Sequence, residues 1–186
     1  NDVQTIDIPT NCLLPEVIES KSRIFLSRCS NSFFRLSLSL DGIGLDHDLI
    51  RGVKGNFENF LETYRRLKLL KVHYKNLNIH INTVASYFNQ DKLLQIIGYI
   101  KNSLDIDTSN ISFVRGITRE NIAKNINLDK YEAALSETLA VNKKRNERRP
   151  LAPLFKNLID LGRENTLKTI KEKRCVAKCF AIRKLS

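Results

Sequence analysis

The sequence predicts an α/β fold, a partial TIM-type (β/α) barrel of parallel strands with about four of six βα units, followed by a helical C-terminal extension. Three observations support this. Short β-like runs alternate with helical segments at intervals of roughly thirty to forty residues, the rhythm of parallel βα units. The second of these runs alternates apolar and polar residues. The chain has 186 residues, of which 42% are hydrophobic and 27% charged, and this suits one globular domain.

Each expected element rests on its own pattern. Pro15 can begin a helix, because the N–H that proline lacks has no partner in a first helical turn. Apolar residues three and four apart predict one buried helix face after residue 56 and another after residue 92. The expected strands are 3–8, 34–40, 77–84 and 111–114, and the expected helices are 15–25, 57–70 and 93–104.

Strand 34–40 has one apolar and one polar face. Leu36, Leu38 and Leu40 alternate with Arg35, Ser37 and Ser39, and a strand places alternate residues on opposite faces. A parallel strand covered on both sides would be apolar throughout, so we expect the polar face to line an open lumen. An antiparallel sheet with one solvated face is the alternative, but it does not explain the long helical connections.

The pattern changes after residue 116. Helical segments are expected at 128–146 and 154–174, with Pro150 and Pro153 between them. We therefore expect a first domain of barrel-type units over 1–116 and a helical extension over 117–186.

Charge and composition narrow the function classes. The net charge of +11 comes largely from clusters at 143–149 and 163–184, which we read as solvated helix faces. No aromatic residues interleave with them to stack on bases, so nucleic acid is an unlikely partner. No run of about eighteen apolar residues predicts a membrane span. The N-terminus does not resemble a signal peptide, so a cytoplasmic location is expected. The chain has no Met, which suggests that it begins within a longer gene.

One block of short motifs is specific. Ser39-Leu40-Asp41-Gly42 is followed by His47-Asp48, then Arg51-Gly52, Gly55 and Phe57. This block resembles the middle of the radical S-adenosylmethionine (SAM) barrel of peptide-modifying enzymes and sulfatase maturases, in which a strand ends in Ser-x-Asp-Gly. Pro9-Thr10-Asn11 is similar to the family's Thr-Asn-Gly, with Cys12 in place of Gly. Asn82 and the run 112–116 are similar to later strands, so the resemblance spans about residues 3 to 116.

The resemblance implies an activity, a cofactor and site residues. Enzymes of this family cleave SAM at an iron–sulfur cluster and give a 5′-deoxyadenosyl radical that abstracts hydrogen from the substrate. It implies a peptide or protein substrate, and a reductant such as a ferredoxin or flavodoxin. No residue is assigned a catalytic role. The residues expected to bind SAM are Ser39 and Arg51 first, then Thr10, Asn11, Asp41 and Asn82.

Structural roles remain open for several of these residues. Asp41 could fix its own turn, and Thr10 and Asn11 could cap the following helix. His47 is expected to order its loop rather than to act as an acid or base. The second overall hypothesis is an inactive barrel remnant that serves as a basic, RNA-binding module.

The chain also departs from the family. It lacks Cys-x-x-x-Cys-x-x-Cys, whose three thiolates hold the cluster, and the Gly-Gly-Glu that binds the SAM amino group. Both are expected upstream of Asn1, so residues 1–116 would be the C-terminal portion of the barrel. This chain alone is then expected not to cleave SAM and to be poorly soluble. Cys175 could be a ligand of an auxiliary cluster at the start of a further domain, or a buried thiol.

Overall fold

The computed structural model describes residues 3–146 together with 165, 168 and 172. The chain divides into two compact units, Asn1–Arg145 and Asn146–Ser186, and the fold described here is that of the first. Its elements, in order, are β1 (Thr5–Thr10), α1 (Pro15–Arg28), β2 (Phe33–Ser39), α2 (Leu45–Arg51), α3 (Asn56–His73), β3 (Leu77–Ala85), the 3-10 turn η1 (Gln90–Lys92), α4 (Leu93–Ser103), β4 (Thr108–Phe113), the 3-10 turn η2 (Asn121–Lys124) and α5 (Leu128–Asn146).

The strands form one parallel sheet in the order β1-β2-β3-β4, so each strand pairs with the next along the chain. This confirms the α/β class and the parallel sheet expected from the sequence. The strands and the helices α1, α3 and α4 lie within a few residues of their expected positions. The short helix α2 was expected as a loop, because seven residues give too little periodicity to predict a helix. It ends at Gly52, whose φ of 68° lies in the left-handed region that favours glycine.

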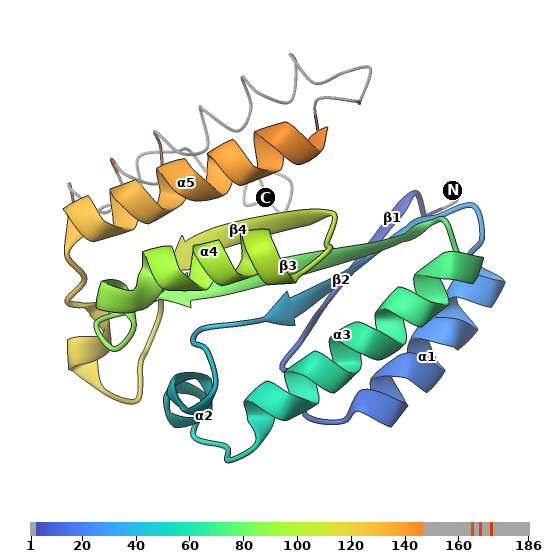
Figure 1. Ribbon diagram of the computed structural model, residues 1–186, viewed down its shortest axis with the longest axis horizontal. Helices are drawn as coiled ribbons and strands as arrows, with labels where there is room; N and C mark the ends of the chain where they lie inside the picture. Colours follow the sequence, from blue (N-terminus) through green and yellow to red (C-terminus); the bar gives the residue numbers. More distant parts are fainter. Residues whose placement is uncertain (1–2, 147–164, 166–167, 169–171, 173–186) are drawn as a thin grey trace, which may run out of the picture. The chain divides into compact units, whose positions relative to one another are not determined.

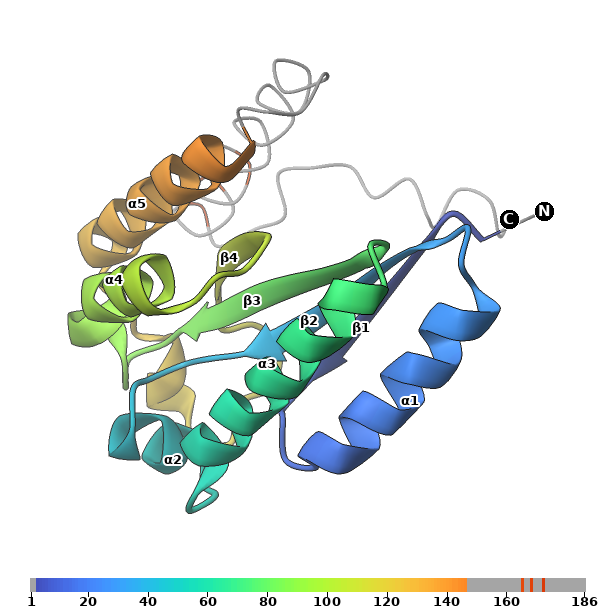
Figure 2. The same ribbon diagram turned by 45° about the vertical axis from the view of Figure 1, so that its right-hand side comes forward.

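One face of the sheet is covered by helices, and the core lies between them. Figures 1 and 2 show α1, α3 and α4 along this face. The core includes Leu38 and Ile81 from the strands and Phe60 from α3, each fully buried. Burial of side chains of this size contributes roughly 1.5–3 kcal/mol each, so packing on this face stabilises the sheet.

The two edges of the sheet differ. At the β4 edge the Asn142 carboxamide of α5 accepts a hydrogen bond from Ser109 N–H (2.9 Å) and donates one to Ser109 C=O (2.6 Å). The Tyr131 hydroxyl donates to the Ile111 carbonyl at 3.4 Å. Helix α5 therefore closes the β4 edge. At β1 the exposed residues alternate with half-buried Ile6 and Ile8, so this edge is less covered.

The helix expected at 128–146 is confirmed as α5. The contacts of Asn142 and Tyr131 join it to β4, so residues up to 145 belong to the same compact unit as the sheet. The expected domain division at residue 116 stays a prediction. The helix expected at 154–174 lies outside the described residues, apart from positions 165, 168 and 172, which are helical. Among the described residues no helix has both the length and the apolarity to cross a membrane.

Candidate functional site

The loop after β2 is built around a close backbone approach. Strand β2 ends at Ser39, and the chain then turns through Asp41 and Gly42 into α2. A Cβ atom added at Gly42 would lie 2.5 Å from the backbone nitrogen of His47. Only glycine leaves room for α2 to pass this close to the end of the strand. The Asp-Gly pair is therefore required by packing as well as by the turn.

Asp41 joins the loop to two other elements. Its Oδ2 pairs with Arg51 Nη2 at 2.8 Å, and its Oδ1 accepts the Val84 N–H of β3 at 2.8 Å. The carboxylate is buried, and burial raises its pKa, although the positive charge of Arg51 opposes this. Asp41 thus holds Arg51 at the carboxyl end of the sheet.

His47 lies beneath this pair, fully buried. Its Nδ1 accepts the backbone N–H of Asp41 at 3.1 Å, so a neutral ring carries its proton on Nε2. Burial, and then the nearby charge of Arg51, lower its pKa to about 4. His47 is therefore uncharged at neutral pH. It orders the loop, in the role expected from the sequence.

Two further side chains complete the loop. Asp48 accepts the N–H groups of Gly55 (2.6 Å) and Phe57 (2.8 Å) at the start of α3, and these bonds lower its pKa. The Asn89 amide donates to the carbonyls of Asp41 and Val84, both at 2.9 Å. The segments after β2 and β3 are therefore held together by side chain to backbone hydrogen bonds.

The expected SAM-binding residues fall into two groups. Ser39 and Asn82 are paired in register at the carboxyl ends of β2 and β3, and Asn82 Oδ1 accepts the Asn110 amide of β4 at 3.3 Å. Asp41 and Arg51 form the ion pair described above. The Arg51 side chain is 24% exposed, and its Nε is buried without a hydrogen-bond partner.

Thr10 and Asn11, by contrast, act within their own turn. Thr10 Oγ1 accepts the Cys12 N–H at 3.1 Å, and Asn11 Oδ1 accepts the Leu13 N–H at 3.3 Å. Cys12 has a φ of 63°, a left-handed conformation that non-glycine residues rarely adopt. A glycine at this position would take that conformation without strain.

The cysteines do not form a metal site in the described part of the chain. Burial raises the pKa of the Cys12 thiol to about 12, with partial opposition from the Ser39 backbone N–H. Cys29 is half-buried. Cys175 lies outside the described residues. Within the described ranges no group of three or more His, Cys, Asp or Glu side chains is arranged to hold a metal ion.

The open face of the sheet carries a polar cluster that the sequence analysis did not single out as a site. Asp7 accepts hydrogen bonds from Ser37 (2.8 Å) and from Arg35 (3.3 Å), and His80 Nδ1 lies 2.8 Å from Thr108 Oγ1. Burial and the charge of Arg35 lower the pKa of His80 to about 4. The alternation of polar residues in β2 and β3 was the available signal for this cluster.

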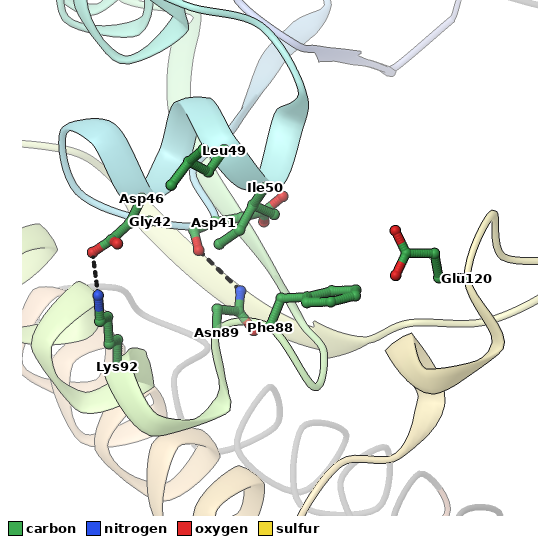
Figure 3. Close-up of a pocket in the computed structure, with 9 residues that line it drawn as sticks. All are labelled: Asp41, Gly42, Asp46, Leu49, Ile50, Phe88, Asn89, Lys92 and Glu120. Carbon is green, nitrogen blue, oxygen red and sulfur yellow. Dashed lines mark hydrogen bonds and ion pairs between the residues drawn. The ribbon is translucent and has the colours of Figure 1, made fainter.

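A pocket of about 290 Å³ opens beside the loop after β2 (Figure 3). Its floor is the loop itself, and its walls come from α2, from the loop before η1 and from the segment before η2. The lining residues are Asp41, Gly42, Asp46, Leu49, Ile50, Phe88, Asn89, Lys92 and Glu120. The sequence analysis missed Phe88 and Glu120, which lie on loops, and Lys92, which ends η1; none of them belongs to a recognisable motif.

The comparisons with known proteins add no identity. No protein-family model matches the chain, and the search of curated proteins finds no significant match.

Proposed function

We propose that this chain is the C-terminal part of a radical SAM enzyme barrel that acts on a peptide or protein side chain. The observation that carries the proposal is the arrangement of the loop after β2. There Asp41 holds Arg51 at the carboxyl end of a parallel sheet, near the strand end at Ser39. Ligands of open α/β sheets bind at the carboxyl ends of the strands.

The residues at this edge fit SAM. The Ser39 hydroxyl can bond a ribose hydroxyl, and the Arg51 guanidinium, whose side chain is 24% exposed, can donate to a carboxylate. SAM itself, once reductively cleaved, supplies the 5′-deoxyadenosyl radical that abstracts hydrogen. The chain's own residues would bind and orient it. Asp41 and His47 act indirectly, because they fix the loop that carries Arg51.

The described residues do not fit the iron–sulfur cluster. Three thiolates are needed, whereas these residues include Cys12 and Cys29 alone, and the Cys12 thiol is buried with a raised pKa. The primary ligands of the cluster are therefore expected upstream of Asn1. Cys175 as an auxiliary ligand, a ferredoxin or flavodoxin as reductant, and a cytoplasmic location belong to the same proposal.

The first test is to read the coding DNA upstream of Asn1 in frame over about two further βα units, roughly 60–120 residues. The proposal expects Cys-x-x-x-Cys-x-x-Cys followed by Gly-Gly-Glu. A frame without these motifs would overturn it.

The second test is SAM binding by the purified chain, measured by calorimetry. Ser39→Ala is expected to weaken binding at least 5-fold, and Ser27→Ala, an exposed serine on α1, should leave it unchanged. Arg51→Lys keeps a positive charge beside Asp41 but loses the planar guanidinium, which can bind a carboxylate through two N–H groups, so it should also weaken SAM binding. Equal affinities for all four proteins would contradict the assignment of Ser39 and Arg51.

The alternative of a basic RNA-binding module has no structural observation in its favour. The side chains of its two basic clusters, at 143–149 and 163–184, lie outside the described residues except for Lys168.

A further inference from the structure

The pocket in Figure 3 has its own pattern of charge. Lys92 Nζ pairs with Asp46 at 2.6 Å, and Asp41 is paired with Arg51. Glu120 also lines the pocket, is exposed, and has no ion-pair partner among the described residues. The paired groups cancel, so the pocket is left with one unneutralised carboxylate in a chain whose net charge is +11.

The pocket is also apolar on the side that faces solvent. Leu49 is 78% exposed and Phe88 is 49% exposed, and both line it. The Tyr87 ring packs edge-on against Phe88, with 5.8 Å between the centroids, so the Phe88 ring is supported from one side. In Figure 3 the Phe88 ring extends toward the Glu120 side of the pocket. Exposed apolar groups gathered at a hollow mark a binding surface more often than scattered ones do.

The loops that carry these residues are tied to each other. The Tyr87 N–H donates to the Ala123 carbonyl at 3.0 Å, and the Gln90 side chain accepts the Asn127 N–H at 2.6 Å. Phe88 and Glu120 are therefore brought together by hydrogen bonds between the β3–α4 loop and the segment around η2, although they lie 32 positions apart in the sequence.

We propose that this pocket binds a guanidinium or alkylammonium group on an aliphatic stem, as carried by an arginine or lysine side chain. The aromatic face of Phe88 attracts a cation, and the Glu120 carboxylate can accept its N–H groups. Leu49 and Ile50 give the stem an apolar wall. A volume of about 290 Å³ suits a single long side chain rather than a folded domain.

This site shares Asp41 with the residues expected to bind SAM and differs from the proposed SAM site in its other lining residues. It uses neither Ser39 nor the Arg51 guanidinium, and it requires no cluster. A cation pocket beside the carboxyl end of the sheet would select basic residues in a partner, whatever chemistry the neighbouring loop performs.

The test uses the whole chain and two matched ligands. The peptide acetyl-Gly-Leu-Arg-Gly-amide is titrated by NMR or calorimetry against the same peptide with citrulline, which has the shape of arginine without its charge. The proposal expects the arginine peptide to bind at least 5-fold more tightly. Equal binding of the two peptides, or no binding of either, would overturn it.

Variants locate the binding. Glu120→Gln and Phe88→Ala are each expected to weaken binding of the arginine peptide at least 5-fold. Phe88→Leu keeps the apolar volume but removes the aromatic ring, so it should also weaken binding. Glu58→Gln and Phe25→Ala are the matched controls, since both residues are exposed and neither lines the pocket. Controls that weaken binding as much as the pocket variants would overturn the proposal.

Two further arms separate the possible sources of the ligand. Agmatine carries the same guanidinium without a peptide backbone, so equal binding of agmatine would support the cation site with a free small cation as its ligand. SAM also carries a positive charge. If SAM displaces the arginine peptide, the pocket belongs to the SAM site, and this inference fails while the proposed function stands.

Discussion

The two faces of the sheet are made by alternate residues of the same strands, but one face is packed with apolar side chains and the other carries paired polar side chains. On the helix-covered face, Leu38 and Ile81 are fully buried and belong to the hydrophobic core. On the open face, Asp7, Arg35 and His80 are each paired with another polar side chain. A parallel sheet is usually apolar on both faces.

The difference teaches where each kind of stability comes from. The covered face gains free energy by removing apolar surface from water, and that gain depends on shape and volume. The open face gains little, because most of its hydrogen bonds replace bonds to water. Asn78 Oδ1, buried and without a hydrogen-bond partner, is an exception that lowers the stability of the open face. Substitutions on the two faces should therefore lower the free energy of unfolding by different amounts.

The largest contrast is expected between two phenylalanines. Phe60→Ala removes a fully buried ring that contacts His47 and Phe57, and should cost about 3–5 kcal/mol. Phe33→Ala removes a half-buried ring on the open face, where Arg35 covers it, and should cost less than half as much. Urea unfolding followed by circular dichroism measures both. Equal losses would show that the open face is packed as tightly as the covered one.

Acid should destabilise the open face through His80 on β3, and the α2 loop through His47, whose ring contacts Phe60 on the covered side. The pKa values of His47 and His80 are lowered to about 4 in the folded chain, so the unfolded chain binds protons first as the pH falls. Their stabilisation is complete above pH 6.5 and is lost between 6.5 and about 4. For the fully buried His47 the loss is on the order of 3 kcal/mol.

Unfolding midpoints measured from pH 7.5 to 4 check this. His47→Gln and His80→Gln should each flatten the pH dependence, whereas His73→Gln, at an exposed position, should leave the slope unchanged. A wild-type midpoint that stays constant across this window would contradict the neutral buried state of both rings.

The smallest contrast is between two hydroxyl groups. Thr83 is buried on the covered face and donates to the Leu40 carbonyl at 2.8 Å, so Thr83→Val should cost about 1–2 kcal/mol. Ser37 donates to Asp7, whose side chain is 46% exposed and can bond water instead. Ser37→Ala should therefore cost about 0.5–1 kcal/mol. The same urea assay measures both losses, and a larger loss for Ser37→Ala than for Thr83→Val would contradict the expected difference between the two faces.

Most of the fold could be predicted from the sequence, because its elements have clear periods. The strict alternation of apolar and polar residues in β2 predicts a strand, and the apolar residues three and four apart in α3 predict a helix. Helix α2 could not be predicted in this way, since it is short and is held by hydrogen bonds of His47 and Asp48 to backbone groups six and seven positions away, outside the helix. The closure of the β4 edge by Asn142 was also missed, because a single Asn in a helix has no sequence signal.

The candidate site was predicted less completely. The motif placed Ser39 and Arg51 near the end of the sheet, but not the ion pair of Arg51 with Asp41. That pair forms because α2 turns back over Gly42, and the turn is a tertiary feature. Phe88 and Glu120 could not be found together, since only contacts between their loops bring them to one pocket.

The Asn142 carboxamide has a consequence for assembly. It satisfies both backbone groups of Ser109 that a neighbouring strand would need, so it takes the place of one residue of a further strand. A strand that joined β4 would have to displace helix α5 first. The two edges of the sheet therefore differ: a further strand can pair with β1 without displacing a helix, whereas β4 is the last strand of the sheet.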